Sequence, residues 1–159
     1  MRSVIYLNLN EAQDATTGST NGFGTDANIG ANSGKTWDLG SNNATNNNGT
    51  NNRYVYYLWK AVAGLSAFGE YTGTANVTTN FRPRLLIVKR KSGGTGNWFM
   101  FDGFREGTDA KSTYILTDTD GAENSTSNAT ATFSNTGFTT GSHDGTGGSG
   151  SSYIYMAYA

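Results

Sequence analysis

Apolar residues in this chain come in short runs rich in Tyr, Phe, Val and Ile, and long polar stretches separate the runs. Such runs, bounded by Gly, Asn, Asp and Ser, are typical of β-strands. They predict strands at Val4–Leu9, Thr36–Leu39, Arg53–Lys60, Ser66–Tyr71, Arg84–Arg90, Trp98–Asp102, Thr113–Thr117, Ala131–Phe133, Gly137–Thr139 and Ser152–Ala159. No segment carries a convincing helical period. We therefore expect an all-β fold, either an antiparallel β-sandwich or a jelly-roll-like barrel.

The polar stretches predict loops. Two of them, Asn42–Asn52 and Ser142–Ser152, consist almost wholly of Asn, Gly, Ser and Thr, and this composition predicts flexible connections. The single proline, Pro83, stands at the start of a predicted strand, where a missing N–H group is tolerated.

The two most aromatic runs, YVYYLWKA at 54–61 and YIYMAYA at 153–159, resemble each other. Strand side chains alternate between two faces, so Tyr54 and Tyr56 oppose Tyr57 and Trp59, and both faces are apolar. A strand of this kind is covered on both sides. We therefore interpret both runs as central strands, and name as candidate interface residues Tyr54, Tyr56, Tyr57, Trp59, Tyr153 and Tyr155.

The likeness extends upstream in the same order. Residues 37–42 match 138–143, and the apolar positions of 3–7 match those of 112–116. This pattern predicts an internal duplication, with a half module over 1–64 and a complete module over 65–159. A half module exposes strand edges. We therefore expect it to complete a sheet across a subunit boundary in a homo-oligomer.

Composition narrows the function classes. The net charge of −1 argues against nucleic-acid binding, which favours a basic excess. No run approaches the ~20 apolar residues of a membrane span. The first residues lack the pattern of a signal peptide, so we expect synthesis in a cytoplasm. Cysteine is absent, which excludes disulfides and thiol chemistry.

Chemistry-bearing residues are sparse. The one histidine, His143, lies in the Gly-rich stretch, where nothing would hold it against a nucleophile. The segment Asp118–Glu123 hints at calcium but fails the EF-hand spacing, and a turn explains it better. We therefore predict no catalytic residue, metal or cofactor. Positive charge at both ends of one strand, from Arg82, Arg84, Lys89 and Arg90, predicts either contact with an acidic partner or protection of an edge strand.

Several motifs follow one another in a fixed order through the second part of the chain. They are Phe68–Gly73, Phe81–Pro83 with Lys89–Arg90, Gly96–Asp102, Ala122–Glu123, Ser134–Phe138 and Tyr153–Ala159. Together they resemble a repeated β-rich module of phage tail-fibre and related virion surface proteins. The chain departs from the module at Asn80, where the module has Gly, and at the extra Thr136.

The resemblance implies a non-enzymatic structural protein on the virion surface, either a head decoration or a tail-fibre component. Its implied partners are other copies of itself, as a homotrimer, and other virion proteins. The alternative is a carbohydrate-binding module that recognises a host surface polysaccharide, because exposed aromatic rings and Asn-rich loops suit sugar stacking and hydrogen bonding.

Overall fold

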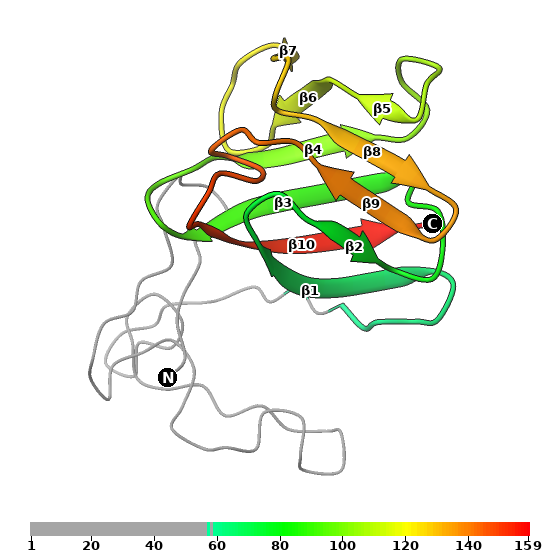
Figure 1. Ribbon diagram of the computed structural model, residues 1–159. Helices are drawn as coiled ribbons and strands as arrows, with labels where there is room; N and C mark the ends of the chain where they lie inside the picture. Colours follow the sequence, from blue (N-terminus) through cyan, green and yellow to red (C-terminus); the bar gives the residue numbers. More distant parts are fainter. Residues whose placement is uncertain (1–56, 58) are drawn as a thin grey trace, which may run out of the picture. The chain divides into compact units, whose positions relative to one another are not determined.

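The computed structural model describes Tyr57 and residues 59–159. Over these residues the chain forms two antiparallel sheets that lie one over the other as layers, which confirms the predicted all-β sandwich (Figure 1). The larger sheet has the strand order β1-β10-β3-β4-β6-β7, and the smaller has the order β2-β9-β8-β5. The strands are β1 Ser66–Thr72, β2 Asn76–Thr78, β3 Leu85–Ser92, β4 Trp98–Asp102, β5 Ala110–Lys111, β6 Thr113–Leu116, β7 Asn124–Ser125, β8 Ala131–Ser134, β9 Gly137–Thr140 and β10 Ser152–Tyr158.

Every strand predicted beyond residue 65 is present, with small shifts at its ends. The predicted strands at Val4–Leu9 and Thr36–Leu39 lie outside the described residues. For the predicted strand Arg53–Lys60, the described residues at its end are not in a strand. Here the Ser66 hydroxyl donates to the carbonyl of Lys60 (2.9 Å) and accepts from the amide of Val62 (3.1 Å), so the chain turns into β1.

The core forms between the two sheets from alternate residues of each strand. From the larger sheet come pairs such as Leu86 with Val88 and Phe99 with Phe101, all buried. From the smaller sheet comes Phe138, whose ring lies 5.2 Å from that of Tyr155 and 6.1 Å from that of Tyr71. Aromatic side chains thus supply much of the core, and edge-on ring contacts join the layers. No described segment forms an apolar helix of membrane-spanning length.

The C-terminal aromatic run forms a central strand, as predicted. β10 lies between β1 and β3 and pairs with both of them antiparallel. Its supposed counterpart around Tyr54 lies outside the described residues. The internal duplication and the division at residues 64 and 65 therefore stay predictions.

The Gly-rich stretch before β10 is packed, which corrects the prediction of a flexible loop. Residues 145–148 are buried, and Thr146 is fully so. The Tyr71 hydroxyl donates to the carbonyl of Thr146 (2.6 Å), and the Tyr153 hydroxyl donates to that of Asp144 (2.6 Å). Tyr153 also accepts from the amide of Gly148 (2.7 Å). Two core tyrosines thus hold this loop, which we call the tyrosine-anchored loop (residues 142–151).

Glycine is needed here for space. A Cβ atom on Gly145 would lie 2.2 Å from the Phe99 ring, and one on Gly147 would lie 2.0 Å from the carbonyl oxygen of Gly141. Both distances are too short for real contacts. The glycines that suggest flexibility in the sequence are therefore needed because they let the backbone lie close to the core.

We predict that Tyr153→Phe destabilises the protein by about 1–3 kcal/mol, because it leaves the buried N–H of Gly148 and the partly buried carbonyl of Asp144 without their partner. The matched control is Tyr155→Phe, since the Tyr155 hydroxyl has no hydrogen-bond partner among the described residues. Denaturant unfolding of the two variants measures the difference. Equal midpoints would show that the loop is held by other contacts.

Candidate functional site

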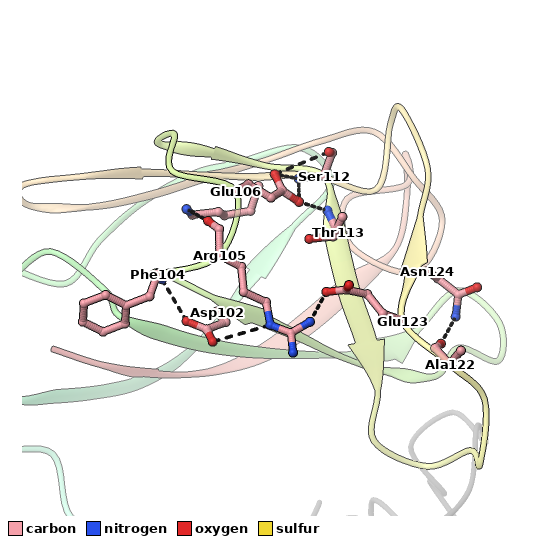
Figure 2. Close-up of polar contacts among 10 residues, drawn as sticks. Asp102, Phe104, Arg105, Glu106, Ser112, Thr113, Ala122, Glu123 and Asn124 are labelled. Carbon is pink, nitrogen blue, oxygen red and sulfur yellow. Dashed lines mark hydrogen bonds and ion pairs between the residues drawn. The ribbon is translucent and has the colours of Figure 1, made fainter.

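A group of charged side chains lies where two loops meet beside the end of β4. One loop connects β4 to β5 and carries Arg105 and Glu106, and the other connects β6 to β7 and carries Glu123 (Figure 2). Asp102, the last residue of β4, faces them. We call this group the rim cluster (Asp102, Phe104, Arg105, Glu106 and Glu123).

Arg105 joins the two loops. Its guanidinium lies between two carboxylates, with Nε 3.7 Å from Asp102 Oδ2 and Nη1 on Glu123 Oε1 (Figure 2). The other oxygen of Asp102 accepts from the amide of Phe104 (2.8 Å) and fixes the turn after β4. Because these side chains are partly exposed, each ion pair contributes at most about 1 kcal/mol. Their main effect is to set the position of one loop against the other.

Glu106 closes the β4–β5 loop. It adopts φ 67°, and its carboxylate accepts from the amides of Ser112 (2.9 Å) and Thr113 (Figure 2). Desolvation raises the pKa of Glu106, but the hydrogen bonds from Thr113 and Ser112, together with nearby Lys111, outweigh it and hold the pKa below its usual value. Glu106 is therefore ionised in the folded protein at neutral pH.

A small pocket opens within the rim cluster. Its volume is about 70 Å³, and its walls are Met100, Asp102, Arg105, Thr113, Tyr114, Ile115 and Glu123. Ligand pockets for drug-sized molecules usually measure about 300–1,000 Å³. The pocket therefore accommodates a small group and does not enclose a sugar ring.

Phe104 lies at the tip of the β4–β5 loop and is 73% exposed. In Figure 2 its ring points away from the Arg105 guanidinium. The guanidinium carbon of Arg84 lies 4.7 Å from the ring centroid, which is a cation–π contact. An exposed aromatic ring thus stands beside charged groups that donate and accept hydrogen bonds.

The four basic residues predicted from the sequence each have a contact within the chain. Arg82 pairs with Asp109 and holds the pKa of that carboxyl below its usual value, and Arg84 contacts Phe104. Lys89 is fully buried and donates to the carbonyl of Gly96. Lys89 and Arg90 lie in β3, and Arg82 and Arg84 lie just before it. Because β3 is central in its sheet, protection of an edge strand is not their role.

Arg90, the fourth of these residues, holds the tyrosine-anchored loop against the β3–β4 turn. Its guanidinium donates to the Ser151 hydroxyl (2.7 Å) and to the carbonyls of Thr95 (3.3 Å) and Gly93. The four cations thus serve separate local contacts and do not gather into one patch.

The predicted interface tyrosines divide into three groups. Tyr153 and Tyr155 are buried in the core of their own chain, which corrects their assignment to a surface between subunits. Tyr57 and Trp59 are 68% and 52% exposed. Tyr54 and Tyr56 lie outside the described residues.

His143 belongs to the tyrosine-anchored loop and is held in place, contrary to the prediction of a mobile position. Its Nδ1 accepts from the amide of Gly145 (2.9 Å), and its ring lies 5.5 Å from that of Phe99. These two contacts give His143 a structural role in the tyrosine-anchored loop.

The carboxylates of the segment Asp118–Glu123 do not act together. Asp118 accepts from the amide of Trp98 (3.2 Å), whereas Glu123 pairs with Arg105. Among the described residues, no three acidic or histidine side chains gather as metal ligands would. The segment begins with a turn after β6, as predicted.

Phe104, Arg105 and Glu106 are not among the candidate residues predicted from the sequence. A local signal was present, because the run DGFREG at 102–107 places charged and aromatic residues between two glycines. The pairing of Arg105 with Glu123 depends on the meeting of two loops, which no local pattern indicates.

We predict that Glu106→Gln lowers stability at neutral pH, by no more than about 1 kcal/mol because the carboxylate is exposed. A lowered folded pKa means that the ionised carboxylate stabilises the protein above the unfolded pKa of about 4.3. That contribution is lost as the pH falls through the folded pKa, where wild type and variant converge. Thermal midpoints of both proteins between neutral and acidic pH measure this, and a constant difference would contradict it.

Comparison with known proteins gives one family. The model of a family described as "Domain of unknown function (DUF7483)" matches residues 2–159, nearly the whole sequence. The comparison with curated proteins found no match, and the comparison with solved structures found none either. The match places the rim cluster, the tyrosine-anchored loop and both sheets within a single family unit. The chain therefore belongs to the DUF7483 family of domains of unknown function.

Proposed function

We propose that this chain is a non-enzymatic structural protein of the phage virion surface and works as a homo-oligomer. It acts either as a head decoration or as a tail-fibre component, in contact with other virion proteins. The resemblance of its ordered motifs to virion surface modules supports the virion setting.

The observation that carries the proposal is the composition of the central strands. β10 reads SYIYMAY, and in it buried Tyr153, Tyr155 and Ala157 alternate with half-buried Ile154, Met156 and Tyr158. β3 begins LLIV with the same alternation. Both faces of these strands are thus apolar. Strands of this kind are typical of sheets that are covered on both sides.

The smaller sheet behaves differently. Its strands alternate buried apolar residues with exposed polar ones, such as Thr132 and Ser134 in β8 and Thr139 in β9. That face suits contact with water. The sandwich therefore has one hydrated outer face and one apolar outer face, which is the arrangement of a building block that assembles through one side.

The proposal is tested by mass spectrometry of purified particles of a phage whose genome encodes this chain. We predict that the chain is present as a stoichiometric component of the particle. A high copy number indicates head decoration, whereas a low one indicates a tail fibre. Absence of the chain from the particle, with accumulation in the lysate, would contradict a virion role.

Carbohydrate binding is the second candidate, and the exposed Phe104 ring favours it. A planar ring beside Arg84 and the rim carboxylates offers a stacking surface together with hydrogen-bonding groups. The ligand would then be a host surface polysaccharide that lies across the rim cluster. Its sugar rings would rest on Phe104, since the pocket itself is too small to hold them.

A glycan array of the isolated protein tests this candidate. If it is correct, the array shows specific binding that Phe104→Ala abolishes and that Phe104→Tyr retains, because tyrosine keeps the stacking surface. If the wild-type protein binds no glycan in the array, carbohydrate binding is excluded and the structural role is the remaining candidate. Equal binding by the alanine variant would exclude Phe104 as the platform.

A further inference from the structure

The outer face of the larger sheet carries one continuous apolar row. Strand register places Phe68 opposite Met156, Met156 opposite Ile87, Ile87 opposite Met100, and Met100 opposite Ile115. The row therefore crosses β1, β10, β3, β4 and β6. We call it the outer row (Phe68, Met156, Ile87, Met100 and Ile115).

The outer row keeps part of its surface accessible. Each of its side chains is half-buried, whereas the residues beside it on the core face, such as Leu86, Val88 and Phe101, are fully buried. Tyr158 and Leu85 lie opposite each other on the same face and add two more apolar side chains beside the row. Large apolar side chains in adjacent strands thus form a patch, and patches of this kind mark interaction surfaces.

The charges around the outer row are neutralised within the chain. On one side of the row, along the strands, Lys91 pairs with Glu70 (2.5 Å). On the other side, Asp102 pairs with Arg105 (3.7 Å). Lys89, on the same face, is fully buried, with its ammonium on the carbonyl of Gly96 and 5.9 Å from the Trp98 ring. With Glu123, the second partner of Arg105, the face carries three negative side chains (Glu70, Asp102 and Glu123) and three positive ones (Lys89, Lys91 and Arg105). Its net charge is therefore zero and would not select an oppositely charged partner.

The size of the face suits contact with an identical face. The five strands have 7, 7, 8, 5 and 4 residues, about six on average. At a strand spacing of about 4.8 Å and a rise of about 3.4 Å per residue, they span roughly 24 Å by 21 Å, or roughly 500 Å². Two such faces in contact would bury roughly 1,000 Å², which is about the least that a specific interface buries. An apolar, neutral surface is also the composition of contacts between identical subunits, in which one patch recognises itself.

We infer that the outer face of the larger sheet binds a second copy of this chain, with the outer row at the centre of the contact. The inference rests on the oligomer in the proposed function and specifies the surface that forms it. The hydrated outer face of the smaller sheet then stays on the outside of the assembly.

Sedimentation of the full chain at micromolar concentration tests this surface. The wild type is expected to be an oligomer, and Ile87→Glu is expected to weaken association at least tenfold, because each contact would have to bury a charge. Thr132→Glu is the matched control, since Thr132 is an exposed strand residue on the outer face of the smaller sheet. It should leave association unchanged.

A second measurement covers the case in which Ile87→Glu fails to fold. The chain has no cysteine, so Ile87→Cys and Thr132→Cys can each be labelled singly with a nitroxide spin label. Labels at position 87 should show dipolar coupling between copies, and labels at position 132 should show much weaker coupling.

The possible failures are distinguishable. A monomeric wild type would overturn both this inference and the oligomer in the proposed function. An oligomer that persists in Ile87→Glu, or that lacks coupling between labels at position 87, would overturn this surface and leave the oligomer intact. The presence of the chain in particles is decided separately by mass spectrometry.

Discussion

The larger sheet and its connections depend on two buried hydroxyl groups. The rings of Tyr71 and Tyr153 stack 5.1 Å apart in the core, and burial raises the pKa of Tyr71 well above its usual value. A buried hydroxyl without a partner is costly. The backbone of the tyrosine-anchored loop supplies the acceptors, and it can approach because glycines leave space for the Phe99 ring. Core, loop and the entry to β10 are therefore one cooperative unit.

The sequence predicts the long strands well, because apolar runs such as those at 85–88 and 153–158 are strong local signals. It misses β2, β5 and β7, which are two or three residues long and contain few apolar side chains. The composition of the tyrosine-anchored loop wrongly predicts flexibility. Composition indicates how freely a backbone can move, but it does not show that Tyr71 and Tyr153 bind this loop to the core. The rim cluster needs two distant loops, so only its parts are visible in the sequence.

The outer faces of the two sheets differ in polarity. The smaller sheet alternates in the ordinary way, with Phe133 inward and Thr132 outward. The larger sheet carries apolar side chains on both faces, and Glu70, Lys91 and Asp102 are held in ion pairs on either side of the outer row. One face thus builds the domain, and the other is the face that we propose for assembly. The rim cluster forms a third kind of surface. There the β4–β5 loop holds the exposed ring of Phe104 beside Arg105, which pairs with Glu123.

The position of β10 has a consequence for biosynthesis. Of the described strands, β10 leaves the ribosome last, yet it lies between β1 and β3, and the contact between Thr72 and Ser152 spans 80 residues of sequence. Until β10 is made, β1 lacks its neighbour in the sheet and β3 exposes one edge. Pairings so distant in sequence form slowly. The nascent chain therefore cannot complete its larger sheet before translation has passed Tyr158, and its apolar strands need protection from premature association until then.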